Sequence, residues 1–174
     1  MASRILALAA LLALLVPATA LAAPGGITNP STLQSLAEAR QASVRYHDPA
    51  AAIADGYIPT TDCVEVPGLG GMGQHWIHPG HFADPALDVS APEVLLYVPS
   101  GQGLRLVAVE YVAIDSDQDL STTDNHSGLF GVPFDGPMPG HFAGMPIHSE
   151  LHVWVWQANP AGVFAGFNPS VHCD

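Results

Sequence analysis

The chain has 174 residues, of which 48% are hydrophobic, and it carries four basic residues, all arginine, against 16 acidic ones. Its net charge is −12. Binding to phosphate backbones or anionic membranes requires clustered Lys and Arg, so this composition excludes nucleic acid as a partner.

Residues 1–22 have the three parts of a secretory signal peptide. Arg4 supplies the positive start, an apolar run from Ile5 to Val16 follows, and Ala20-Leu21-Ala22 fits the small-x-small cleavage pattern. We expect cleavage after Ala22, with Ala20 as the second choice. A membrane anchor is disfavoured because the apolar run has about a dozen residues, whereas a spanning helix needs about 20. No later segment is long and apolar enough to span, so the sequence predicts a secreted or periplasmic protein.

The mature chain, residues 23–174, is expected to form one extracytoplasmic domain that begins with two helices. Residues 31–46 have capping residues at their start and apolar residues at helical spacing. Asp48-Pro49 then begins a second, shorter helix, with Asp48 as its N-cap and Gly56 as its C-cap glycine.

A glycine-rich stretch from Gly68 to Gly73 follows the helices. It lacks the preceding strand and following helix of a phosphate-binding loop, so we interpret it as a bulge or a point of close backbone approach. His75, His78 and His81 come next, at the spacing of a metal-binding group. In a strand, however, His75 and His78 face opposite ways, and Pro79-Gly80 then turns the chain. We expect at most one or two of the three to share a site, and His75 is the best placed.

Residues 93–98 and 104–114 are predicted to form two strands of a hairpin. Both faces of the second strand are mostly apolar, which is typical of a central strand, and Glu110 lies within it. Strict alternation gives Glu110 the same face as Leu104, Leu106, Ala108, Val112 and Ile114. A buried carboxylate must be paired, protonated or bound to a metal. Glu110 is therefore either a metal ligand or a structural hydrogen-bond acceptor, for Arg40 or Arg45.

Residues 147–157 form the last predicted strand, and one of its faces is unusually polar. Alternation places on that face His148, Glu150, His152, Trp154 and Trp156. Imidazole and carboxylate ligands together suit Zn, Cu, Fe or Mn. A helix would place two of these histidines at i, i+4, but the β-branched and aromatic residues that follow favour a strand. A solvated strand face and hydrogen bonding within the core are the alternatives to a metal or ligand pocket.

Two cysteines, Cys63 and Cys173, remain in the mature chain, and an even number in an oxidising compartment predicts a disulfide. The same compartment disfavours a pair of metal-binding thiolates. The remaining histidines stand alone in the sequence and are expected at the surface: His47, His126, His141 and His172. The order of elements predicts an α+β fold, with N-terminal helices packed on one face of a small antiparallel β-sheet.

Four motifs span most of the mature chain: GGMGQHW at 70–76, PEVLLY at 92–97, VAVEY at 107–111 and ELHVW at 150–154. Together with the two cysteines, they resemble a family of secreted bacterial proteins that has no assigned function. The resemblance implies a common fold and directs attention to His75, Glu110 and His152.

The sequence therefore predicts an extracytoplasmic protein that binds a transition metal ion (Zn, Cu, Fe or Mn). His75, His148 and His152 are the expected ligands, and Glu110 or Glu150 completes the set or acts as a catalytic base. An open coordination position would permit hydrolytic or oxidative chemistry.

Two other functions stay open at this point. One is a small-molecule binding module with an apolar pocket lined by Trp76, Trp154 and Trp156. The other is a structural or interaction protein whose histidines lie at the surface.

Overall fold

The computed structural model describes residues 27–101, 103–122 and 129–174. The predicted signal peptide and its cleavage site lie outside the described residues, as does His126. Among the helices of the described ranges, none is long and apolar enough to cross a membrane.

Both predicted helices are present, and their ends are where the capping residues place them. Helix α1 (Pro30–Ser43) begins at Asn29, whose side chain accepts from the Ser31 backbone N–H, and continues into the 3-10 helix η1 (Val44–His47). Helix α2 (Pro49–Asp55) begins at Asp48 and ends at Gly56, which has a left-handed φ of 108°. A short helix, α3 (Pro79–Ala83), follows His78.

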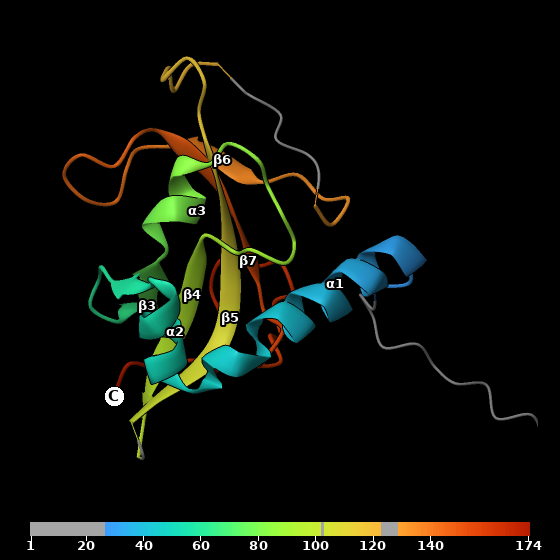
Figure 1. Cartoon of the computed structure of the whole chain (residues 1–174), viewed down its shortest axis with the longest axis vertical. Coiled ribbons are helices and arrows are strands. Elements are labelled where there is room, and N and C mark those ends of the chain that lie inside the picture. Colours follow the sequence, from blue (N-terminus) through green and yellow to red (C-terminus); the bar gives the residue numbers. More distant parts are fainter. Residues whose placement is uncertain (1–26, 102, 123–128) are drawn as a thin grey trace, which may run out of the picture.

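The strands form one antiparallel sheet with the order β1-β3-β4-β5-β7-β6, and β2 pairs with β3 outside this path. Their bounds are β1 Ile58–Pro59, β2 Val64–Val66, β3 Gly70–Ile77, β4 Val94–Ser100, β5 Gly103–Ile114, β6 Asp135–Met138 and β7 His148–Val153. The hairpin predicted from the sequence is β4–β5. Figure 1 shows α1 and α2 beside the long central strands, which confirms the predicted α+β class.

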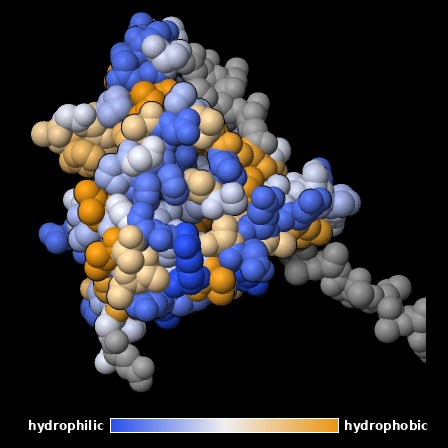
Figure 2. Space-filling model, in the orientation of Figure 1, coloured by the Kyte–Doolittle hydropathy of each residue, from blue (hydrophilic) through white to orange (hydrophobic). Residues whose placement is uncertain are grey.

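The sheet has two faces with different coverings. One, the helix face, packs Leu95, Tyr97 and Val109 against Ala39 and other residues of the helical segment. Tyr97 also donates through its hydroxyl to the backbone carbonyl of Tyr46, at 2.6 Å. The other, the distal face, carries Leu96, Ala108 and Val112. On the outer surface seen in Figure 2, α1 presents mainly hydrophilic residues to solvent.

The strict alternation predicted for residues 104–114 is wrong because β5 contains a β-bulge. Leu96 pairs with Ala108, but the next residue, Tyr97, pairs with Leu106, so Val107 is an extra residue in β5. A bulge reverses the alternation of side chains beyond it. Leu106 therefore lies on the helix face, whereas Ala108 and the residues that alternate with it, Glu110 included, lie on the distal face.

The last strand ends four residues earlier than predicted, at Val153. The backbone N–H groups of Trp156 and Gln157 both donate to the carbonyl of Val107, the bulge residue, so the chain leaves the regular ladder there. As a result Trp156 packs on the helix face, where its indole N–H donates to Ser43 Oγ at 3.0 Å. The polar face predicted for this strand keeps only its first four members.

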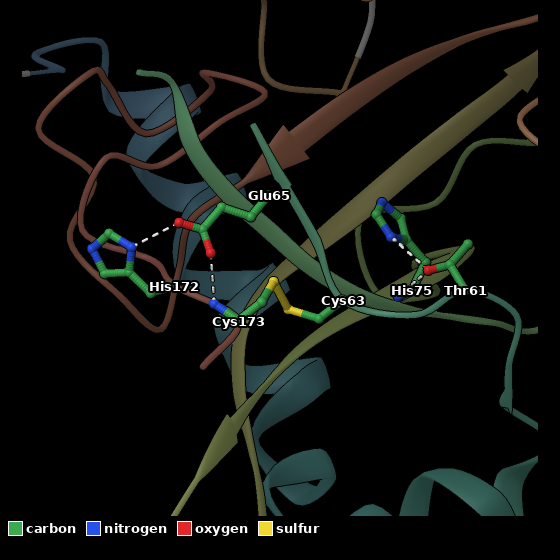
Figure 3. The surroundings of a disulfide bond; sticks show 6 residues. All are labelled: Thr61, Cys63, Glu65, His75, His172 and Cys173. Atoms are coloured by element: carbon green, nitrogen blue, oxygen red, sulfur yellow. Dashed lines mark hydrogen bonds and ion pairs between the residues drawn. A yellow bond between two sulfur atoms is a disulfide. The ribbon is translucent and has the colours of Figure 1, made fainter. Parts of the chain in front are cut away.

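Three contacts join the C-terminal segment to β2, β3 and the residues before them. A Cβ at Gly70 would lie 2.1 Å from the carbonyl oxygen of Asn168, so the glycine-rich stretch is a point of close approach, as predicted. The predicted disulfide joins Cys63 to Cys173, with a Cα–Cα distance of 5.6 Å (Figure 3). Glu65 of β2 accepts from the Cys173 backbone N–H at 2.9 Å.

Candidate metal site

Three strands place His75, Glu110 and His152 on the distal face of the sheet. Glu110 of β5 and His152 of β7 are direct cross-strand partners, so their side chains stand next to each other. His75 lies on β3, on the other side of β4, where it pairs with Leu96 of the distal face. Its side chain therefore reaches toward Glu110 across the apolar surface of β4.

One ligand atom from each of these residues lies within 4.8 Å of the other two. His75 Nε2 and Glu110 Oε2 are 3.6 Å apart. Ligand atoms that share a first-row metal ion at about 2.1 Å lie roughly 3–3.5 Å from one another, so this spacing is close to that of a bound site. All three residues are buried, with exposed fractions of 8% for His75, 2% for Glu110 and 1% for His152.

Three buried polar atoms of this group lack hydrogen-bond partners. Among the described residues, four buried side-chain atoms have none: Glu110 Oε2, both ring nitrogens of His152, and Asp115 Oδ2. A buried polar group without a partner costs about 1–3 kcal/mol. Three of the four atoms therefore gather in one place, where a single cation would bind Glu110 Oε2 and one ring nitrogen of His152.

The histidines of the group are held in the neutral form that binds metals. Burial and the neighbouring His152 ring lower the pKa of His75 to about 3, and burial also lowers the pKa of His152. Thr61 Oγ1 lies 3.3 Å from His75 Nδ1 and orients the ring, as Figure 3 shows. Orientation of a metal-binding imidazole through its second nitrogen is usual in metal sites.

Glu110 and Glu150 are neighbouring carboxyl groups whose pKa values are shifted in opposite directions. Burial and the adjacent Glu150 carboxylate raise the pKa of Glu110 well above its usual range. Burial alone would also raise the pKa of Glu150, but the hydrogen bond with His148 and the nearby His152 outweigh it and lower that pKa to about 2. Glu150 therefore carries the negative charge when the pair holds one proton.

His148 does not join the group in which the sequence placed it. It is on the same face of β7 as His152 but four residues away, which corresponds to about 13 Å along a strand. Instead, one ligand atom from each of His141, His148 and Glu150 lies within 4.8 Å of the others. No sequence pattern pointed to His141, because it lies in an irregular segment between β6 and β7 without periodicity.

A cavity of about 290 Å³ adjoins both groups and is lined by His75, Glu110 and His141. The rest of its wall is largely apolar and includes Met72, Val112, Phe142 and Met145. The polar groups of its wall belong to these two groups of potential ligands and to Thr60 and Thr61.

Two of the three histidines at the spacing of a metal-binding group, His78 and His81, have structural partners instead. His78 caps α3 by accepting from the His81 backbone N–H at 3.0 Å, and its Nε2 lies 2.9 Å from the Asp55 carbonyl oxygen. His81 Nδ1 lies 3.1 Å from the carbonyl oxygen of Pro92. Of the three, only His75 has its ring in the candidate site, in agreement with the sequence analysis.

Neither arginine proposed as a partner of Glu110 reaches it. Arg40 donates to the carbonyl of Val155, and Arg45 pairs with Asp55. Both belong to the helical segment, which covers the opposite face of the sheet. The prediction that Glu110 accepts from an arginine is therefore wrong, and the metal alternative is left with the stronger support.

The aromatic pocket predicted from the sequence exists only in part. Trp154 and Trp156 line a cleft of about 680 Å³ together with Arg40 and other residues of α1. Trp76 is not part of it, because its ring packs in the core at 4.8 Å from Tyr97. The cleft has no group of metal ligands.

No family model, curated protein or solved structure matches the chain. The resemblance of its motifs to a family of secreted bacterial proteins therefore stays a prediction.

Proposed function

We propose that this is an extracytoplasmic metal-binding protein whose ion is held by His75, Glu110 and His152. The observation that carries the proposal is the convergence of three buried residues, two of which, Glu110 and His152, have buried atoms without a hydrogen-bond partner. Two imidazoles and one carboxylate bind Zn, Cu, Fe or Mn. The disulfide supports an extracytoplasmic location, because such bonds persist in oxidising compartments.

The position of the cavity supports chemistry at the ion. Three protein ligands leave at least one coordination position for water or a substrate, as in catalytic zinc sites and in iron sites with two histidines and one carboxylate. When bound, the ion would act as a Lewis acid or a redox centre. The apolar wall of the cavity would exclude water around the bound molecule, and the anionic Glu150 beside the site would offset part of the positive charge of the ion. Hydrolytic or oxidative chemistry on a small molecule is the proposed reaction class.

Metal analysis of the purified mature protein, grown and dialysed with all four candidate metals available, tests the proposal. The wild type should retain stoichiometric metal, and His152→Ala should lose the ion at this site. His47→Ala is the matched control, because His47 lies on the helical segment and contacts Trp156 rather than the site. A wild-type protein that is folded by circular dichroism yet binds none of the four metals would refute the proposal.

The cleft beside α1 favours a second function, a small-molecule binding module. Its two tryptophans and Arg40 offer an apolar wall with one cationic group. Ligand binding there should be insensitive to chelators and to His152→Ala, but should weaken with Trp156→Ala. These responses separate it from binding at the metal site.

A further inference from the structure

We propose that the chain binds a second metal ion at His141, His148 and Glu150, and that the carboxylate of Glu150 bridges this ion and the first. The inference rests on the proposed first site and extends it to a two-metal centre. It concerns a different set of ligands, of which His141 was expected to be an isolated surface residue.

The three residues converge on one oxygen atom. His148 Nε2 lies 3.3 Å and His141 Nε2 lies 4.0 Å from Glu150 Oε2. The two imidazole rings are 4.9 Å apart between centroids and are nearly perpendicular. His148 and Glu150 are buried on β7, whereas the His141 side chain is 40% exposed, so the group lies at the edge of the buried region, where an ion can enter.

The hydrogen bonds of His148 direct its Nε2 atom toward the carboxylate. His148 Nδ1 lies 3.1 Å from the carbonyl oxygen of Pro146, which can only accept, so this nitrogen carries the proton of the neutral ring. Nε2 is then the nitrogen that faces Glu150 Oε2, at 3.3 Å. In the metal-free chain these two atoms share a proton in a hydrogen bond, and a metal ion would take the place of that proton and bind the Nε2 lone pair. A ring fixed by a backbone carbonyl through its second nitrogen is the usual arrangement of a metal-binding histidine.

The same carboxylate is also in contact with the first group. Its other oxygen, Glu150 Oε1, lies 3.8 Å from His152 Nδ1, one of the buried nitrogens without a hydrogen-bond partner. Glu150 pairs with Val112 of β5, two residues from Glu110, so the two carboxyl groups are neighbours on the distal face. One oxygen of Glu150 thus faces each group, which is the placement of a bridging ligand between ions about 3.5–4 Å apart.

A thioether adds to the ligands available at the second position. Met138 Sδ lies 3.4 Å from His141 Nε2. Thioether sulfur is a soft ligand that favours copper over hard ions such as magnesium and calcium. Zn(II) and Cu(II) are therefore the probes of choice.

The test of the second site is the number of metal ions that the mature protein binds after its metal has been removed. Titration with Zn(II), followed calorimetrically and by metal analysis, should give two equivalents for the wild type. His141→Ala should bind one, because its exposed side chain can be removed without opening the core, and His47→Ala should still bind two. With Cu(II), two ions about 4 Å apart should couple magnetically, so the wild type should lack the spectrum of isolated Cu(II) and His141→Ala should display it.

The results that overturn the two proposals differ. One equivalent in the wild type, lost in His152→Ala and unaffected in His141→Ala, would overturn the second site and leave the first. Glu150 would then serve only to orient His152. No bound metal in the wild type would overturn both. Two equivalents with fully isolated Cu(II) spectra would overturn the bridge.

Discussion

Replacing Glu110 by glutamine should separate the stability of the metal-free protein from its ability to bind metal. Glutamine has the shape of a protonated glutamic acid and can donate to Glu150, so it imitates the form that burial favours. It cannot become an anionic ligand. We therefore expect Glu110→Gln to stabilise the metal-free protein and to weaken metal binding.

The size of the stabilisation follows from the protonation of Glu110 in the two states. In the unfolded chain Glu110 has a pKa of about 4.3 and is ionised at pH 7. In the folded metal-free chain its pKa is raised, so the folded state binds more protons and loses stability as the pH rises above the unfolded pKa. Holding that proton at pH 7 costs at most about 3–4 kcal/mol, which is about 1.4 kcal/mol for each unit above 4.3. The gain from glutamine should stay within that limit at pH 7 and vanish near pH 4.

Urea unfolding at pH 4 and pH 7, with a chelator and with saturating Zn(II), measures both effects. A ligand at about 1,000 times its Kd stabilises the folded state by about 4 kcal/mol, so Zn(II) should stabilise the wild type by about that amount and Glu110→Gln by clearly less. Glu38→Gln, on the exposed side of α1, is the control and should change neither quantity. If Glu110→Gln destabilises the metal-free protein at pH 7 and leaves the effect of Zn(II) intact, the reasoning about this site is wrong.

Three further predictions concern groups outside the candidate site. The disulfide closes a loop with a sequence separation of 110, so Cys63→Ser combined with Cys173→Ser should lower the free energy of unfolding by about 4–5 kcal/mol in urea titrations; a loss below about 1 kcal/mol would contradict this. Burial raises the pKa of Glu93 to about 8. Between the pKa of Glu93 in the unfolded chain and pH 8, the folded state keeps a proton that the unfolded chain releases. The free energy of unfolding therefore falls as the pH rises through this range. Glu93→Gln should remove up to about 1.4 kcal/mol per pH unit of that slope, and an unchanged slope would refute the assignment. Finally, the Glu65 carboxylate raises the pKa of His172, so Glu65→Gln should lower the pKa found by NMR titration toward about 6.5; an unaltered titration would show that the contact is absent in solution.

The candidate site could be predicted in part because strand alternation is a local property. Glu110 stands in a run of apolar strand residues, so its burial was predicted from the pattern, and alternation placed Glu150 and His152 on the same face of the last strand. His75 was singled out by its place after the glycine-rich stretch. Alternation does not predict which strands pair when they are distant in sequence. That pairing places His152, and not His148, next to Glu110.

The remaining differences have equally specific causes. A bulge such as that at Val107 is one extra residue in a run of good strand formers, and nothing in the run marks it. His141 reaches Glu150 only through the course of an irregular segment, which has no periodicity to interpret. The shift of Trp156 to the helix face follows from the bulge itself, since the Trp156 backbone bonds to the carbonyl of Val107.

The position of the site within the sheet bears on how metal binding relates to folding. Glu110 and His152 lie on β5 and β7, whose register is fixed by six consecutive residue pairs, and the disulfide holds the C-terminal segment against β2. The larger apolar cluster, with the helices, lies on the opposite face and includes none of the ligands. In zinc fingers the metal supplies the folding energy because no other core exists. Here the core is complete without the ion, so the ligands are held in place before it binds, and chelation should lower the stability of the protein without unfolding it. In such a preorganised site the buried, unpartnered atoms of Glu110 and His152 destabilise the metal-free protein. A bound ion removes this destabilisation, which favours metal binding.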